Sequence, residues 1–202
     1  YGAEVILIHD AGNIGACIEE CLQTALRMER EDPNVFVPQQ FSNENNTKAH
    51  RHHTALEIME QVAGPIHGFC SGIGTGGTIT GIGEVLKAQN PDIEIWAVEP
   101  ENAAILAGGN IGTHLQMGIG DGVIPDILNQ QIYDDIYIVS DEEALQTAKD
   151  LAKKEGLMCG ISSGTNVAAA LKLAEKLGEG KTVVTVLPDT AERYFSTPLF
   201  DD

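Results

Sequence analysis

Short apolar runs alternate with helical patterns along most of this chain. Amphipathic segments separate most of the runs, and each run has the composition of a buried strand. The runs occupy residues 5–8, 66–70, 93–98, 136–139 and 182–187. Because strands that alternate with helices usually form parallel sheets, we predict an α/β fold with a mostly parallel, twisted sheet and helices on both faces.

The clearest helix signals follow the fourth apolar run. Ser140 can cap a helix, and Glu143, three residues later, completes a capping box. Lys153 and Lys154 favour the C-terminal end of a helix, and Gly156 is suited to end it. We therefore predict a helix that begins after Ser140 and ends at Gly156.

A glycine-rich turn follows the second apolar run, where residues 69–78 read FCSGIGTGGT before a helical pattern at 79–87. Glycines let the backbone bend, which leaves main-chain N–H groups and the hydroxyls of Thr75 and Thr78 free to surround phosphate oxygens. The helix would add the positive end of its dipole. The sequence therefore predicts an anion-binding turn, although the spacing matches neither GxGxxG nor GxxxxGK[ST] and a turn without a ligand is the alternative.

Composition narrows the class of protein further. The net charge of −18, from 30 acidic and 12 basic residues, opposes binding to nucleic acid or anionic membranes. No apolar run approaches membrane-spanning length and no signal segment is recognised, so we expect a soluble, cytoplasmic protein. Four cysteines, at 17, 21, 70 and 159, lack CxxC spacing and lie in apolar contexts, which favours reduced core residues over zinc ligands or disulfides.

The start of the chain has an unusual pattern. Residues 2–7 carry a strand pattern with no cap or turn before it, as in a chain cut within a βαβ series. We therefore expect the C-terminal part of something longer. The composition changes at 32–33, and the polar segment 42–48 follows, so the predicted domain crossing lies between them.

Five motifs in series resemble those of the cysteine synthases, the O-acetylserine sulfhydrylases of the fold-type-II, tryptophan synthase β-like, pyridoxal-phosphate (PLP) enzymes. They are QQFSN at 39–43, SGIGTGGT at 71–78, GIGxGxIP at 118–125, GISSG at 160–164, and LPD with ERYFST between 187 and 197. The resemblance covers nearly the whole chain in the family's order. It implies that residues 1–40 end a smaller N-terminal domain and that 41–202 form a larger, incomplete PLP-binding domain.

The resemblance implies roles for residues of two of these motifs. The PLP phosphate would be held by the residues of the glycine-rich turn, which are Gly74, Thr75, Gly76, Gly77 and Thr78. Ser162 would hydrogen-bond the pyridine nitrogen without keeping it protonated, which biases the chemistry towards β-elimination and replacement. The alternative for Ser162 and Ser163 is helix capping.

Two further loops would complete the site. Gly118, Ile119 and Gly120 would line the cofactor and substrate side, although these glycines would also serve a simple bend. Pro188 and Asp189 end an apolar run, where α/β sheets usually place ligand groups.

Some positions depart from the family pattern. Met117 stands where relatives usually have Gln, with Gln116 one position earlier, and residues 53–57 read HTALE in place of TTGPE. These changes bear on substrate specificity and loop motion. His50, His52 and His53 could suggest a metal site, but only 50 and 53 would share a helical face, so we predict a polar helix face and no metal.

The family's Schiff-base lysine, in an SxKDR-like motif, and its TSGNTG-like substrate-carboxylate loop do not occur in this sequence. The lysines lie mostly in polar helical contexts and are expected to be solvated. They stand at positions 48, 87, 149, 153, 154, 172, 176 and 181. No catalytic residue is therefore assigned, and we expect the chain alone to be inactive.

The resemblance implies PLP-dependent replacement of the acetate of O-acetylserine by sulfide to give L-cysteine in the intact enzyme. It also implies a homodimer and, in some members, a complex with serine acetyltransferase. Two alternatives stay open. One is a non-catalytic fragment or pseudoenzyme that acts as a binding module, and the other is a nucleotide-binding α/β domain in which Glu99 would contact the ribose.

Overall fold

A four-stranded, fully parallel sheet forms the centre of the computed structural model, which describes residues 2–9 and 14–201. Its strands are β1 (Gly68–Gly72), β2 (Glu94–Pro100), β3 (Asp135–Val139) and β4 (Val183–Val184). They lie in the order β3-β2-β1-β4, so the predicted α/β fold with a parallel sheet is confirmed.

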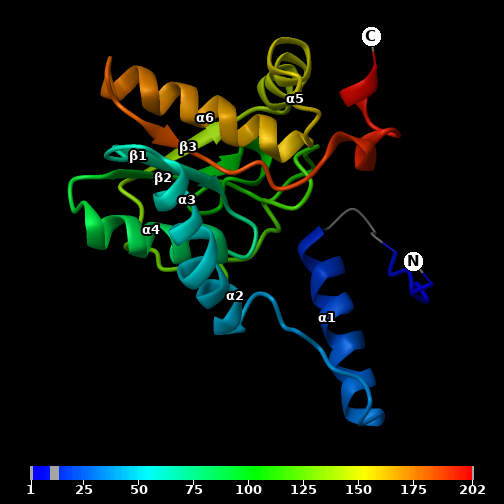
Figure 1. The fold of residues 1–202 in the computed structure, drawn as a ribbon. Coiled ribbons are helices and arrows are strands. Elements are labelled where there is room, and N and C mark those ends of the chain that lie inside the picture. Colours follow the sequence, from blue (N-terminus) through cyan, green and yellow to red (C-terminus); the bar gives the residue numbers. More distant parts are fainter. Residues whose placement is uncertain (1, 10–13, 202) are drawn as a thin grey trace.

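Helices cover both faces of the sheet. The α-helices are α1 (Ile14–Glu31), α2 (Glu44–Ala49), α3 (Ala55–Gln61), α4 (Gly77–Gln89), α5 (Asp141–Asp150) and α6 (Ile161–Leu177). Short π-helical turns, at His50–Thr54 and Leu151–Glu155, connect α2 to α3 and extend α5. Short 3-10 turns occupy Glu101–Ala103, Ala191–Tyr194 and Pro198–Phe200. Figure 1 shows α5 and α6 on one face, α4 on the other, and α1 set apart from both.

Alternate residues of the central strands belong to two separate apolar cores, one on each face of the sheet. Phe69 and Ile95 face the α4 side, where Ile79 and Ile82 of α4 join them. Their strand neighbours, such as Cys70 and Val98, face α5 and α6 on the other side. This period-two division explains why the strands read as continuous apolar runs.

The expected strands at the two ends of the chain are wrong in part. Residues 5–8 form no strand, and Val5, Ile6 and Leu7 are 74%, 57% and 88% exposed. An apolar run becomes a strand only where a neighbour supplies its backbone partners, and no described strand pairs with this one. The expected strand at 182–187 is paired only at Val183 and Val184, which are half-buried, because the chain then turns its backbone groups to side chains of other elements.

The predicted helix after Ser140 is confirmed at both ends. The Ser140 hydroxyl accepts a hydrogen bond from the Glu143 N–H (3.1 Å), and Gly156 ends the π-helical extension of α5 at φ +71°. The capping alternative for Ser162 and Ser163 is wrong, since α6 begins at Ile161 with Gly160 as its N-cap. Both serines lie inside its first turn.

The prediction of four core cysteines is correct for Cys70 and Cys159, which are buried. Cys17 is half-buried and Cys21 is exposed, because α1 contributes to neither apolar core. None of these four cysteines forms a disulfide within the described residues. In the described part of the chain, no helix is both long and apolar enough to span a bilayer.

The order of the strands locates a natural ligand site. The chain passes from β1 to β2 to β3 in one direction, and then returns to place β4 on the other side of β1. In open α/β sheets, ligands bind in the crevice beyond the carboxyl ends of the strands where the order reverses. That point lies between β1 and β4, and the glycine-rich turn begins there.

Candidate functional site

The glycine-rich turn joins the carboxyl end of β1 to the N-terminus of the thirteen-residue helix α4. Gly76 is the N-cap of α4, with φ +75°. The backbone N–H groups of Gly74, Thr75, Gly76 and Thr78 make no hydrogen bond to any other described residue. Unpaired amides at a helix N-terminus suit an anion, so the turn has the geometry of a phosphate cradle.

Thr75 is held from two sides. Its Oγ1 accepts hydrogen bonds from Asn46 Nδ2 (2.9 Å) and from the Gly77 N–H (3.3 Å). The Gly77 amide is therefore occupied within the protein. Its missing side chain makes room for Asn46, because a Cβ at position 77 would lie 2.1 Å from Asn46 Oδ1.

Thr78 is linked to one of the histidines. Its Oγ1 lies 3.2 Å from His50 Nε2, and His50 Nδ1 lies 3.1 Å from Thr54 Oγ1. Burial lowers the pKa of His50 and thus favours the neutral ring. His52 and His53 are exposed, and within the described residues no group of three or more His, Cys, Asp or Glu could hold a metal ion.

The loop 118–120 lies directly against the glycine-rich turn. A Cβ at Gly74 would be 2.4 Å from the Gly118 carbonyl oxygen, and the Gly120 N–H donates to the Ile73 carbonyl (2.9 Å). Gly118 adopts φ +87°, and Ile119 is buried. The structure thus brings two of the sequence-predicted loops together.

Gln116 joins this second loop to the face of the sheet that α5 and α6 cover. Its side chain is fully buried, and Nε2 donates to the Val139 carbonyl (3.0 Å) and to Asp141 Oδ1 (2.9 Å). Its Oε1 accepts from the Thr165 hydroxyl (2.8 Å). Met117, by contrast, is 50% exposed and presents its thioether at the start of the loop.

Ser162 reaches the site through α6. One turn further along, Asn166 Oδ1 accepts from the Gly72 N–H (2.7 Å) and Nδ2 donates to the Val186 carbonyl (2.8 Å), which joins the ends of β1 and β4. Because residues four apart share a helix face, Ser162 lies on the side of α6 that faces these strand ends. Its side chain is buried, and it makes no hydrogen bond to another described residue.

Asp189 follows β4 and carries a buried oxygen without a partner. Its Oδ2 accepts from the Tyr194 hydroxyl (2.6 Å), whereas Oδ1 has no hydrogen bond in the described part of the chain. Gly160 allows this carboxylate to lie close, since a Cβ there would be 2.0 Å from Oδ1. Burial and the bond to Asp189 raise the pKa of Tyr194. Pro188 is exposed beside it.

A pocket of about 430 Å³ adjoins the second loop. It is bounded by α1, by residues 37–42 and by Asp121. Burial raises the pKa of Asp121, and His114 partly opposes this rise. Gln39, at the wall of the pocket, adopts φ +49°, which is uncommon outside glycine and is a feature of ligand-binding segments.

The structure argues against a nucleotide site. Glu99 is 2% exposed, and its two carboxylate oxygens accept from the N–H groups of Leu106 (2.9 Å) and Ala107 (3.0 Å). Burial raises the pKa of Glu99, and those backbone bonds partly oppose the rise. An acid that is committed to its own loop is not free to bind a ribose.

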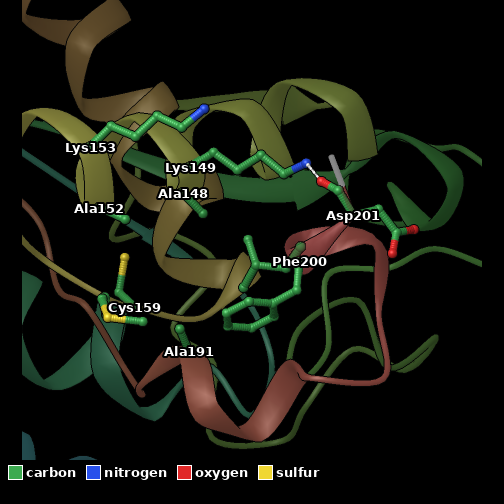
Figure 2. Close-up of a pocket in the computed structure, with 10 residues that line it drawn as sticks. Ala148, Lys149, Ala152, Lys153, Cys159, Ala191, Phe200 and Asp201 are labelled. Atoms are coloured by element: carbon green, nitrogen blue, oxygen red, sulfur yellow. Dashed lines mark hydrogen bonds between the residues drawn. The ribbon is translucent and has the colours of Figure 1, made fainter.

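None of the eight lysines is buried. Ion pairs with carboxylates hold residues 48, 87, 154, 172 and 176. Figure 2 shows Lys149 and Lys153 beside a different pocket of about 300 Å³, where Lys149 donates to the Asp201 carbonyl (2.6 Å). Lys181 is exposed.

Sequence reasoning missed several residues that shape the site: Asn46, Gln116, Asp121 and Asn166. Each is polar and lies in a segment where a polar residue is ordinary, so nothing in the local pattern marks it. For Asn46 the available signal was its position three residues after the helix cap Asn43 in the QQFSN segment.

A parallel sheet with unpaired amides at its switch point is an arrangement of α/β proteins that suits a phosphorylated ligand. Residues 1–189 match the family described as pyridoxal-phosphate dependent enzyme, and the chain belongs to this family. The enzymes of this family use PLP as their cofactor.

Similar proteins include cysteine synthases and a hydrogen sulfide-producing enzyme. A cysteine synthase of Staphylococcus aureus (strain Mu50 / ATCC 700699) is 44% identical over 205 residues, which cover all of this chain and 64% of that protein. The crystal structure of cysteine synthase (OASS) from Entamoeba histolytica is 42% identical with a TM-score of 0.88, covering all of this chain and 59% of that one. A hydrogen sulfide-producing enzyme from Fusobacterium nucleatum is 38% identical with a TM-score of 0.87, covering all of this chain and 60% of that one.

The chain therefore has the fold of these fold-type-II enzymes and spans less than two thirds of the length of the curated relatives it matches. The expected family, fold class and cofactor type are confirmed.

Proposed function

We propose that this chain is the cofactor-binding portion of a cysteine synthase. In the intact enzyme, the acetate of O-acetylserine would be replaced by sulfide to give L-cysteine. The observation that carries this proposal is the set of unpaired backbone amides between β1 and α4, at the switch point of the sheet. The 44% identity to a cysteine synthase supports the choice within the family.

The residues present fit a PLP phosphate. The amides of Gly74, Thr75, Gly76 and Thr78 would donate to its oxygens, together with the two threonine hydroxyls, and the α4 dipole favours the negative charge. Gly77 would contribute indirectly by admitting Asn46. The glycine at position 74 keeps the floor of the cradle open beside Gly118.

Ser162 would orient the pyridine ring. When bound, PLP supplies an electron-withdrawing ring that makes the substrate Cα–H bond acidic. A hydroxyl at the ring nitrogen does not hold a proton there as an aspartate would, and this favours elimination and replacement at the β-carbon. The unpaired Asp189 Oδ1 is a second polar group at the same strand ends and would act as an acceptor.

The loop Gly118–Ile119–Gly120 would form the substrate side. Its tight contact with Gly74 supports this proposal, because a substrate on the loop would then lie next to the phosphate cradle. Met117 presents an exposed thioether at the start of the loop, which would make contact with a substrate less polar than an amide does. Asp121 lies at its other end, with a carboxyl group that burial makes easier to protonate.

The chain alone would bind PLP weakly and would not make cysteine. Covalent catalysis with PLP needs an amine of lowered pKa beside the cofactor, and the eight lysines are all outside the buried interior. By itself the chain would then act as a binding module rather than as an enzyme. We assign residues 1–40 to the end of a smaller domain, which is supported by the apolar cores beginning only at Ala55.

The intact enzyme is proposed to be a cytoplasmic homodimer that in some settings binds serine acetyltransferase. An acidic surface with net charge −18 supports solubility and disfavours nucleic acid and anionic membranes as partners.

The test uses the purified chain with PLP and with pyridoxal, which lacks the phosphate. Equilibrium dialysis should detect PLP binding that is weakened by added inorganic phosphate, and pyridoxal should bind less well. Borohydride reduction followed by mass spectrometry should label no single lysine stoichiometrically, and no cysteine should form from O-acetylserine and sulfide. A stoichiometric pyridoxyl-lysine together with turnover would show that the chain is a complete enzyme. Equal affinities for PLP and pyridoxal would contradict the proposal that the turn binds the phosphate.

Ser162 has a separate test in the intact enzyme. Ser162→Asp should lower the rate of cysteine formation while PLP stays bound, because the carboxylate would hold a proton on the ring nitrogen. Ser140→Asp, which makes the same substitution at the N-cap of α5, is the matched control. Unchanged turnover in Ser162→Asp would leave this serine without a role at the cofactor.

A further inference from the structure

Asn46 connects two segments that the sequence analysis treated separately. It lies on α2, and its Nδ2 donates to the Gln40 carbonyl (2.9 Å) and to Thr75 Oγ1 (2.9 Å). A side-chain amide nitrogen has two protons, so both are used. One side chain therefore joins the QQFSN segment to the glycine-rich turn.

The orientation of this amide is determined by its partners. Turning it over would place Asn46 Oδ1 against the Gln40 carbonyl, where two acceptors would face each other. In the present orientation Oδ1 rests against Gly77, at a distance that leaves no space for a side chain there. The nitrogen therefore points to Thr75.

The consequence lies in the single proton of the Thr75 hydroxyl. A threonine hydroxyl has two acceptor lone pairs and one donor proton. The amide of Asn46 and the N–H of Gly77 occupy both lone pairs. The Thr75 proton must therefore be donated to a third group, and among the described residues no acceptor takes it.

We propose that Asn46 is a positioning residue that holds the Thr75 hydroxyl as a donor to the phosphate of the cofactor. This inference rests on the proposed function, in which the turn 74–78 binds that phosphate. Donation by Thr75 to an anion also makes its oxygen a better acceptor, so phosphate binding strengthens the bond from Asn46. Asn46 then steadies the Gln40 backbone, and occupancy of the phosphate site is transmitted to the segment 39–43.

The full chain of 202 residues allows a test with a matched control. Asn46→Asp replaces the donor by an acceptor, so the Thr75 proton turns to the new carboxylate and the phosphate loses a donor. Asn45→Asp adds the same charge one residue away, at an exposed side chain without a hydrogen bond to another described residue. Asn46→Ala removes the amide without adding charge. The affinities for PLP, pyridoxal and inorganic phosphate are measured by equilibrium dialysis, and folding is followed by the fluorescence of Trp96.

We expect Asn46→Asp and Asn46→Ala to lower the affinities for PLP and for inorganic phosphate about tenfold or more relative to wild type. The reason is that hydrogen bonds to charged groups are stronger than those between neutral groups. The affinity for pyridoxal should not change, and Asn45→Asp should behave as wild type. In a Thr75→Val background, Asn46→Ala should alter PLP affinity by less than about twofold, because the hydroxyl through which it acts is gone. Inorganic phosphate should slow hydrogen exchange at residues 39–43 in wild type and not in Asn46→Ala.

The inference is overturned if Asn46→Ala keeps wild-type affinity for PLP. It is also overturned if Asn46→Ala lowers the affinity for pyridoxal as much as that for PLP, because Asn46 would then have only a structural role. Should both Asn46 variants fail to fold, Thr75→Val tests the same hydroxyl with Asn46 in place, and unchanged phosphate affinity there also overturns it. A wild-type chain with no preference for PLP over pyridoxal overturns the proposed function itself. If the wild-type chain prefers PLP over pyridoxal but the Asn46 variants do not change the affinity for PLP, only the inference is overturned.

Discussion

Gly74 and Gly118 approach so closely that a Cβ on Gly74 would stand 2.4 Å from the Gly118 carbonyl oxygen. These two backbones belong to loops forty-four residues apart by their numbers, and their contact joins the phosphate cradle to the predicted substrate side. Since the atom in the way is backbone, the loop and not a flexible side chain would have to move.

Gly74→Ala should therefore separate the two loops. We expect weaker binding of PLP by the chain, with a loss of unfolding free energy of roughly 1–3 kcal/mol, because overpacking against backbone is not relieved by rotamer changes. Urea unfolding and equilibrium dialysis measure the two effects. Gly64→Ala, at φ +94° with nothing within 4 Å of a new Cβ, is the control that adds backbone strain without a clash and should keep PLP affinity. Full PLP affinity in Gly74→Ala would mean that the loop contact is dispensable.

Gly76→Val should abolish phosphate-dependent binding of PLP. The N-cap position has φ +75°, which a β-branched residue adopts at a cost of roughly 1–3 kcal/mol, and the new Cβ would lie 2.8 Å from Leu128 Cβ. Gly108→Val imposes the same backbone strain at φ +82° with open space around it. The control should lose stability yet keep PLP affinity, and a Gly76 variant that binds as well as the control would exclude the turn from the site.

The buried amide of Gln116 should make a large contribution to the free energy of unfolding. Gln116→Leu removes a hydrogen-bond partner from the Val139 carbonyl, from half-buried Asp141 and from the buried Thr165 hydroxyl, which keeps only the longer bond to the Ile161 carbonyl (3.3 Å). The expected loss of unfolding free energy is about 1–3 kcal/mol for each group left unsatisfied. Gln146→Leu, at an exposed position on α5, serves as the control in urea unfolding. Equal stability of the two variants would contradict the importance of this network.

Acid should weaken the fold through His50. Burial lowers the pKa of His50 below that of an unfolded chain, so its contribution to stability is present above about pH 6.5 and is lost as the pH falls through the folded value. The decrease in unfolding free energy between about pH 7.5 and 5.5 should be smaller in His50→Gln than in wild type. His53→Gln, at an exposed histidine, should follow wild type. If His50→Gln loses as much stability in acid as wild type does, another group is responsible.

The cysteines should react with a disulfide reagent in a defined order. Burial raises the pKa of Cys70 to about 12, so almost no thiolate exists at pH 8, whereas Cys21 is exposed. Native protein should be labelled quickly at Cys21 and not at Cys70, and both should react in denaturant. Peptide mapping after timed labelling provides the measurement, and rapid native labelling of Cys70 would contradict the core arrangement.

The sequence predicted the central strands well because burial on both faces makes their apolar runs continuous. It predicted the helix after Ser140 because its cap and its terminal glycine are local signals. The apolar run at 5–8 carries the same local signal, yet whether it pairs depends on a neighbour far away in the chain. Local pattern cannot supply that information.

The candidate site divides in the same way. The glycine-rich turn could be recognised because its composition is unusual. Asn46, Asn166 and Gln116 act through hydrogen bonds to residues that are remote in sequence, so no spacing along the chain reveals them. The exposure of Cys21 was missed for a related reason. An amphipathic pattern predicts a helix but does not identify the surface against which that helix packs.

The pairing of β4 with β1 has a consequence for the order of assembly. The two strands meet across a separation of 115 residues, from Gly68 to Val183, and Asn166 ties their ends together. During synthesis the phosphate cradle leaves the ribosome long before Asp189 and the strand that brings it to the site. We therefore expect a nascent chain that ends before β4 to be unable to retain PLP, so that cofactor capture is a late event in folding, after the longest loop in the sheet has closed.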